Sequence, residues 1–320
     1  MVERHAKDLG YETSVDGKGN LLAWTAGATE LPRAVVTAHL DEIAMMVTQL
    51  EPDGVLQVKA VGGLFPWKLG EGPVIILAKS GDLNGVLSFG SIHTADSSSV
   101  VRRVDNGPLT WEMATVFTGL STKDLAKKGV RPGTRIVVSP SRRNLTVLGD
   151  HISGYFLDDR ADLVAMLLAM KELKKAKLDV LFVATAAEEV GGEGALYLLQ
   201  EIRPEICVAL ELGPSVPDAP VALSSDPTVW VTDSYSSTSA ADLDLIAEVG
   251  ESLDLELQFQ ALSRGGSDAS CAASHGHCAR PITLGLPMQN SHGYEIMHRD
   301  APKQLAHLTV ALLKRLLSEG

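Results

Sequence analysis

The chain has 320 residues, enough for one large domain or two of ordinary size. Apolar residues make up 45% and charged residues 21%, which is the balance of an ordinary globular protein. The longest uninterrupted apolar run covers only residues 163–170, whereas a membrane span needs about twenty apolar residues. The composition therefore excludes a membrane-spanning protein, and we expect no membrane partner.

The charge balance argues against nucleic acid as a partner. The chain carries 28 Lys and Arg against 40 Asp and Glu, a formal net charge of −12. A protein that binds a phosphate backbone usually presents a basic stripe, because it must displace counterions from a polyanion.

Three cysteines cannot form a disulfide framework, and the first residues, MVERHAKDLG, lack the apolar core of a secretory signal. We therefore expect a cytoplasmic protein.

Two sequence patterns alternate along the chain. Residues 1–53 and 151–320 alternate short apolar strands with helices, which predicts one α/β domain with a mixed, largely parallel sheet and helices on both faces. Residues 54–150 are short strands broken by glycine and turn pairs, which predicts a small β-rich domain inserted into the first. The α/β domain is expected to contain strands at residues 12–24, 33–38, 180–186, 206–210 and 282–286, and helices at residues 159–176, 193–201, 240–253 and 301–317.

Polar side chains follow the predicted strands at the positions where such a sheet binds its ligands. In an open α/β sheet these positions lie beyond the carboxyl ends of the strands. The residues concerned, in chain order, are His39 and Asp41, Asp158 and Asp159 before the predicted buried helix, Glu188 and Glu189, Glu211, and His292. We therefore expect two histidines and several carboxylates at one rim of one sheet.

This set of side chains suits a pair of metal ions. Nitrogen and oxygen ligands without thiolate favour zinc, manganese or cobalt. Two histidines and three carboxylates can hold two ions if one carboxylate bridges them, and ions about 3.5–4 Å apart form a hydrolytic pair. Of the adjacent Glu188 and Glu189, one can ligate while the other acts as general base. Each element alone has an ordinary structural explanation, such as a solvated helix start or an N-cap, so the prediction rests on their joint placement.

Several motifs together resemble one known family. They are Ala-His-Leu-Asp-Glu-Ile-Ala-Met-Met-Val at 38–47, Leu-Asp-Asp-Arg at 157–160, Glu-Glu-Val-Gly at 188–191, Gly-Gly-Ser-Asp-Ala at 265–269 and Ser-His at 291–292. As a group they resemble the tetrahedral aminopeptidase family, which includes glutamyl and deblocking aminopeptidases and members labelled endoglucanases. The resemblance covers nearly the whole chain. It implies a zinc-peptidase-like α/β domain and an inserted domain that is a PDZ-like β-barrel.

The resemblance also implies a role for each site residue. His39, Asp158 and Glu211 would hold one metal, Asp158, Glu189 and His292 the other, with Asp158 bridging, Glu188 as general base and Asp41 orienting His39. Two divalent ions per chain follow, with zinc favoured over cobalt or manganese. The implied reaction removes N-terminal residues from short peptides, by attack of a metal-bridging hydroxide on the scissile carbonyl. The family further implies a homo-oligomer, either a dimer or a twelve-subunit shell.

Three departures from the family pattern bear on the substrate and on the start of the chain. Glu211 stands where the family usually has aspartate, and Gln289-Asn290 stand where it often has Arg-Tyr. The chain also begins close to the strand expected at residues 12–24, so most of the family's first helix is expected to be missing. The first two departures keep an alternative open, in which the same metals serve a deacylase, carboxypeptidase or dipeptidase that acts on blocked or amidated small peptides.

Other functions fit the sequence less well. A glycosidase also uses two carboxylates, but the adjacent Glu188 and Glu189 cannot easily flank a sugar and the histidines would have no role. A metal-free scaffold protein would leave the complete ligand set unexplained. The segment Cys271-x3-His275-x-His277-Cys278 could form a second zinc site, although its spacing matches no common structural zinc pattern.

Overall fold

The computed structural model describes residues 1–25, 31–176 and 178–318. The chain forms two compact units. The first unit comprises Met1–Asp41, Thr146–Ser291 and Glu295–Gly320, and the second comprises Glu42–Leu145 with His292–Tyr294. The first is an α/β unit with a mixed sheet and the second contains a closed antiparallel barrel, so the predicted fold class is confirmed.

The α/β unit is built on an eleven-stranded sheet. Its strand order is β1-β2-β12-β3-β13-β16-β17-β11-β10, with β14 and β15 attached beside β16. Strands β12, β3, β13 and β16 are parallel neighbours, so their carboxyl ends lie along one edge of the sheet. The strands are β1 (Glu12–Val15), β2 (Leu21–Trp24), β3 (Ala34–His39), β10 (Thr146–Leu148), β11 (His151–Tyr155), β12 (Val180–Thr185), β13 (Ile206–Pro214), β14 (Thr228–Thr232), β15 (Gln258–Ala261), β16 (Arg280–Gln289) and β17 (Tyr294–His298).

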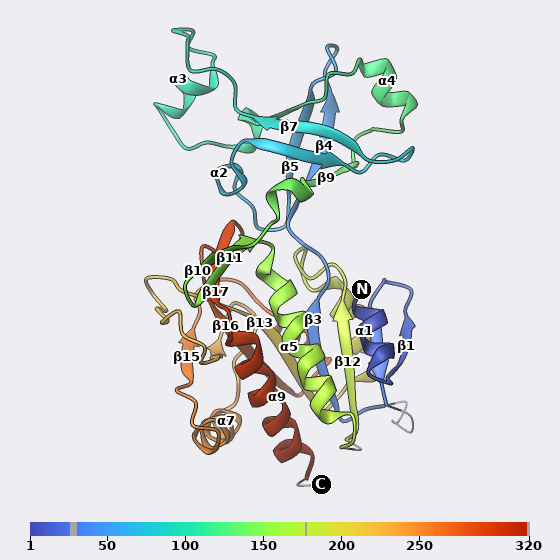
Figure 1. Ribbon diagram of the computed structural model, residues 1–320, viewed down its shortest axis with the longest axis vertical. Coiled ribbons are helices and arrows are strands. Elements are labelled where there is room, and N and C mark those ends of the chain that lie inside the picture. The colour runs from blue at the N-terminus through green and yellow to red at the C-terminus, as the bar shows by residue number, and fades with distance from the viewer. Residues whose placement is uncertain (26–30, 177, 319–320) are drawn as a thin grey trace. The chain divides into compact units, whose positions relative to one another are not determined.

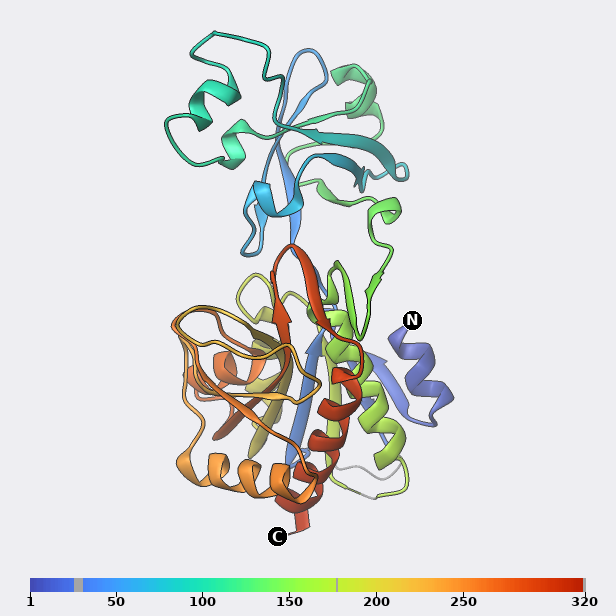
Figure 2. The same ribbon diagram turned by 60° about the vertical axis from the view of Figure 1, so that its left-hand side comes forward.

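Helices cover both faces of this sheet because its central strands are apolar on both sides. Val36 and Val208 pack into the core under α5 and α9, which lie side by side in Figures 1 and 2, whereas Val35 and Cys207 pack into the core under α6 and α8. Within the described ranges, no helix combines the length and apolar character needed to cross a membrane. The helices are α1 (Val2–Asp8), α5 (Leu157–Leu173), α6 (Glu193–Ile202), α7 (Ala240–Ser252), α8 (Asp268–Ser274) and α9 (Ala301–Ser318).

Three expected strands differ clearly from the structure, and one of them, expected at 282–286, extends over Arg280–Gln289. The segment 12–24 forms two antiparallel strands, because Asp16 accepts the backbone N–H groups of Lys18 and Gly19 and closes a turn between them. The strand expected at 206–210 continues to Pro214, since it stays paired with β16 over its whole length. Glu211 therefore lies inside β13 and is buried, so the expectation that it follows the strand was wrong.

Two glycines allow close packing where β13 and β16 meet Thr228 of β14. A Cβ atom on Gly213 would lie 2.2 Å from the Thr228 hydroxyl oxygen, and one on Gly285 would lie 2.5 Å from it. We expect Gly213→Ala to destabilise the protein by about 1–3 kcal/mol, because the added methyl overpacks a buried contact. Urea unfolding followed by circular dichroism measures the change. Gly107→Ala is the control, since its Cβ would meet no atom within 4 Å, and equal midpoints for the two variants would contradict the expectation.

The second unit is organised around a closed barrel with strand order β4-β5-β8-β7-β6-β9. Alternate residues of its strands, such as Leu56, Val74, Leu87 and Ile136, are fully buried and fill the interior. The barrel strands appear in the blue to green part of Figure 2. They are β4 (Ala44–Leu50), β5 (Leu56–Val61), β6 (Gly72–Ile76), β7 (Leu83–Ser88), β8 (Thr115–Phe117) and β9 (Arg135–Val138), and the helices beside them are α2 (Pro66–Leu69), α3 (Val100–Val104), α4 (Thr122–Lys127) and the 3-10 turns Trp111–Met113 and Pro140–Arg142.

Candidate metal centre

His39 lies at the centre of the candidate site, at the carboxyl end of β3. Its side chain is buried, and its Nε2 lies 3.1 Å from Oδ1 of Asp158. Its Nδ1 lies 3.0 Å from the carbonyl oxygen of Asp41 and 3.8 Å from Oδ1 of the same residue. The backbone N–H of His39 donates to Asp159. One ring nitrogen therefore faces Asp158 and the other faces Asp41. Asp159 holds the backbone of the same residue.

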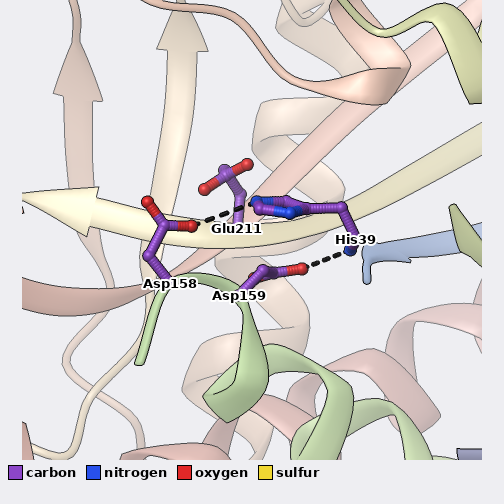
Figure 3. Close-up of side chains that lie close together, drawn as sticks. All are labelled: His39, Asp158, Asp159 and Glu211. Carbon is purple, nitrogen blue, oxygen red and sulfur yellow. Dashed lines mark hydrogen bonds and ion pairs between the residues drawn. The ribbon is translucent and has the colours of Figure 1, made fainter. Parts of the chain in front are cut away.

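Four buried residues bring potential ligand atoms together around this imidazole. One ligand atom from each of His39, Asp158, Asp159 and Glu211 lies within 4.8 Å of the others. Figure 3 shows the side chains of Asp158 and Glu211 approaching the ring of His39, while Asp159 directs one oxygen at the His39 backbone. Glu211 is supplied by β13, and one of its oxygens accepts the backbone N–H of Leu212 at 2.8 Å. The structure therefore places three of the predicted ligands in one cluster.

The start of α5 brings two consecutive aspartates into this cluster. Phe156 adopts a left-handed conformation, and Asp158 and Asp159 have dihedral angles outside the helical region. The regular helix therefore begins only at Arg160, and successive side chains are not held to helical spacing before it. The sequence placed Asp159 among the polar residues at this rim but gave no indication of its contact with the backbone of His39.

Two further buried carboxylates lie close to the cluster. Asp162 is fully buried, and within the described part of the chain neither of its oxygens has a hydrogen-bond donor. Asp268 accepts a hydrogen bond from the Thr185 hydroxyl at 2.6 Å. Burial raises the pKa of the Asp268 carboxyl, whereas this hydrogen bond and the charge of His39 lower it. Asp268 belongs to the Gly-Gly-Ser-Asp-Ala motif noted in the sequence. Asp162 belongs to no such motif, and the available signal was an acidic residue inside an otherwise apolar helix.

The concentration of negative charge shifts the pKa values of the site. Burial raises the pKa of the Glu211 carboxyl well above its ordinary value, and the Asp158 carboxylate raises it further. Burial also raises the pKa of Asp162 to about 7. For His39, burial opposes protonation, but the carboxylates of Asp159, Asp158 and Glu211 outweigh it and raise its pKa well above the ordinary value. The cluster therefore needs positive charge in its centre.

A divalent cation fits this requirement. Carboxylates offer only acceptor oxygens when ionised. Oδ1 of Asp159 and both oxygens of Asp162 are buried, and no described residue donates a hydrogen bond to them. One imidazole nitrogen and several carboxylate oxygens are a common donor set for zinc, manganese or cobalt, and the ion would neutralise the charges that raise each other's pKa. The residues present therefore suit a divalent metal, while their individual roles as ligands stay predictions.

The loop after β12 carries Glu188 and Glu189 and is fixed by Asp41. The Asp41 carboxylate accepts the backbone N–H of Glu188 at 3.0 Å and that of Glu189 at 3.3 Å. A side-chain oxygen of Glu189 lies within 4.8 Å of one from Asp158. Burial raises the pKa of Glu188 well above its ordinary value, and the charges of Asp268, Glu189 and Asp158 raise it further. Asp41 thus connects the end of β3 to the loop that holds the predicted general base.

His292 belongs to the second compact unit. It lies between β16 and β17, and its Nδ1 donates to the carbonyl oxygen of Gly63, 2.6 Å away. A histidine held in this way keeps Nε2 as its ligand atom. Its assignment as a ligand of the second metal stays a prediction.

The Cys/His segment does not form a second cluster. Among the described residues, the groups of three or more metal-ligand side chains with atoms within 4.8 Å of one another do not include Cys271, His275, His277 or Cys278. Cys271 and Cys278 are buried, and Cys278 packs in the apolar core under α6 and α8. The His275 ring instead lies 2.9 Å from the carbonyl oxygen of Cys271.

A mixed α/β sheet with a buried cluster of an imidazole and carboxylates beside its parallel strands defines a candidate metal-dependent hydrolase. Comparison with known families gives a match to the M42 glutamyl aminopeptidase model over residues 19–308. The chain belongs to the M42 glutamyl aminopeptidase family, and it is a peptide hydrolase of the aminopeptidase class. The resemblance noted in the sequence is thereby confirmed.

Individual relatives agree with this assignment. The chain is 28% identical over 325 residues to a lysyl aminopeptidase of Pyrococcus furiosus, covering 98% of this chain and 88% of that protein. It is 22% identical over 297 residues to a glutamyl aminopeptidase of Lactococcus lactis, covering 90% and 82%. Among solved structures, the TET1 peptidase of Pyrococcus horikoshii is 26% identical with a TM-score of 0.83, covering 98% of this chain and 92% of that one. That peptidase can assemble into a tetrahedron or a large octahedral shell.

Proposed function

We propose that the chain is a two-metal aminopeptidase that removes N-terminal residues from short peptides. His39, Asp158 and Glu211 would hold one ion and Asp158, Glu189 and His292 the other, with zinc favoured over cobalt or manganese. The observation that carries the proposal is the buried cluster of one imidazole and three carboxylates, supplied by the end of β3, the interior of β13 and the start of α5. Bound divalent ions activate water and polarise the scissile carbonyl.

The residues of the chain would supply proton transfer and positioning. Glu188 would take a proton from the attacking water and deliver it to the leaving amine, and its raised pKa makes it a stronger proton acceptor than an ordinary carboxylate. Asp41 keeps Glu188 in place through the backbone and limits the movement of the His39 ring. Both contacts reduce the reorganisation needed during the reaction.

The proposed domain organisation and assembly follow the family. Residues 1–53 and 151–320 would form the catalytic domain, and the inserted residues 54–150 would shape access to the site. The tetrahedral or octahedral assembly of the Pyrococcus horikoshii relative supports a homo-oligomer, with a dimer or a dodecamer as the expected states. The substrate is a peptide, and no nucleic acid or membrane is needed for the reaction.

Metal removal tests the proposal. Protein purified gently should contain up to two divalent ions per chain by elemental analysis, and dialysis against a chelator should abolish hydrolysis of aminoacyl amides. Restoring Zn²⁺, Mn²⁺ or Co²⁺ should restore activity, since the cluster supplies the ligands. Full activity in metal-free protein would disprove the mechanism.

The second candidate is a deacylase, carboxypeptidase or dipeptidase that acts on blocked or amidated peptides. Glu211 favours it, because a glutamate at this position shifts the carboxylate within β13 relative to the aspartate usual in the family. Assays of matched peptides with a free or an acetylated amine distinguish the two candidates.

Glu211→Asp tests whether this residue sets specificity. The change removes one buried methylene, so we expect a stability loss of only about 1 kcal/mol. The retracted carboxylate should change the ratio of activities on free-amine and acetylated peptides by about fivefold or more. Glu248→Asp, on the exposed side of α7, is the control and should leave the ratio unchanged. An unchanged ratio in Glu211→Asp, with metal content intact, would shift attention to Gln289 and Asn290.

A further inference from the structure

The segment that precedes the regular part of α5 is held by a residue from a distant part of the chain. Asp158 and Asp159 have dihedral angles outside the helical region, so helical hydrogen bonding does not fix the backbone of Asp158. Instead, Oε2 of Glu295 in β17 accepts the backbone N–H of Asp158 at 3.1 Å. Glu295 therefore binds the backbone of a residue that contributes to the metal cluster.

The Glu295 side chain is buried, with 2% exposure, although glutamate usually lies at the protein surface. Its contact with the Asp158 backbone is therefore shielded from water. A buried N–H that loses its acceptor is costly, because no solvent replaces the hydrogen bond.

Two other carboxylates hold neighbouring parts of the site in the same way. Asp159 accepts the backbone N–H of His39, and Asp41 accepts those of Glu188 and Glu189. The segments that carry the predicted ligand His39 and the predicted base Glu188 are thus each fixed by a carboxylate from another part of the chain. Glu295 completes this pattern for Asp158. Contacts of this kind orient metal ligands, and their loss commonly weakens metal binding.

We propose that Glu295 is a positioning residue that fixes the backbone of Asp158 so that its carboxylate meets the metal ions. The proposal rests on the proposed function, in which Asp158 bridges both ions. Glu295 acts through its hydrogen bond with the Asp158 N–H, which depends on the length of the Glu295 side chain. Its negative charge also favours the helix N-terminus, but charge alone does not fix the orientation of Asp158.

Two conservative variants distinguish the effect of the length of the Glu295 side chain from the effect of its charge. Glu295→Gln keeps the side-chain length and an acceptor oxygen but removes the charge. Glu295→Asp keeps the charge but shortens the side chain by one carbon–carbon bond, about 1.5 Å, so that it no longer reaches the Asp158 N–H. The Kd for Zn²⁺ is measured by competition with a chromogenic chelator, together with kcat and KM at saturating metal. Ser239→Ala is the control, since Ser239 caps α7 in the same unit without belonging to the metal cluster.

We expect Glu295→Asp to raise the Kd by about 10–100-fold, and Glu295→Gln to change it by less than about threefold. Ser239→Ala should lower the thermal midpoint and leave the Kd unchanged. Unchanged metal affinity in Glu295→Asp would overturn the proposal and leave Glu295 without a role in metal binding. If Glu295→Gln lost affinity and Glu295→Asp did not, the proposal would also be overturned. The charge of Glu295, and not its hydrogen bond to Asp158, would then support metal binding. Failure of the unmodified protein to bind Zn²⁺ would instead overturn the proposed function and this inference with it.

Discussion

Replacing Glu188 with glutamine should lower kcat by about 10²–10⁴-fold while the metal content stays unchanged. The amide cannot accept the proton of the attacking water, although it has nearly the same shape as the carboxylate. The backbone of the loop should also keep its position, because Asp41 holds the N–H of residue 188 rather than its side chain. Steady-state kinetics and elemental analysis of the same preparation measure both properties.

Glu189→Gln is the matched comparison, since it makes the same chemical change one residue further along. Glu189 has an oxygen within 4.8 Å of one from Asp158, and it is the predicted ligand of the pair. This variant should therefore lose metal from one site. If Glu188→Gln lost the metal and Glu189→Gln kept it, the roles assigned to the two residues would have to be exchanged.

Replacing Arg280 with methionine should destabilise the protein by about 3–5 kcal/mol. The guanidinium of Arg280 binds the carboxylate of Asp242, which is 3% exposed, and Nε lies 3.2 Å from Oδ1. Methionine keeps much of the side-chain volume but leaves the buried Asp242 charge without its cation. Ser239 still donates to Asp242, but a hydroxyl cannot balance a charge. Thermal and urea unfolding measure the loss.

Arg33→Met is the control because it removes a more exposed ion pair next to Arg280. Arg33 pairs with Glu205, which also pairs with Arg280. The side chains of Arg33 and Glu205 are 38% and 43% exposed. Exposed ion pairs contribute about 0–1 kcal/mol, so this variant should remain close to the unmodified protein. Similar losses for both variants would show that burial of Asp242 does not set the size of the effect.

Much of the site could be predicted because its residues follow short apolar strands. His39 ends β3 and the aspartates open α5, so the change from apolar to polar residues marks both positions in the sequence. The position of Glu211 could not be predicted in this way. The end of β13 depends on its pairing with β16 up to Pro214, and such pairing joins segments that are distant in the sequence. The apolar pattern alone therefore predicted an end of that strand at residue 210, before its end at Pro214.

The side chains that support the site were harder to predict than the candidate ligands. Asp162 and Glu295 occupy positions in a helix and a strand where an acidic residue usually faces solvent. Their burial follows from the packing of α5 and β17 in the folded unit, and no local motif marks it. The contact between Asp41 and the Glu188 loop likewise joins the ends of two adjacent parallel strands, which only the sheet order brings together.

The closed barrel of the second unit limits how this chain could add strands from another molecule. Every barrel strand already has a neighbour on each side, so none of the barrel strands is an outer strand. Within the described residues, the outer strands belong to the large sheet, and β10 is one of them. All three residues of β10 are exposed, including Val147 and Leu148. A hydrogen-bonded continuation of a sheet between two molecules would therefore use an outer strand of the α/β unit.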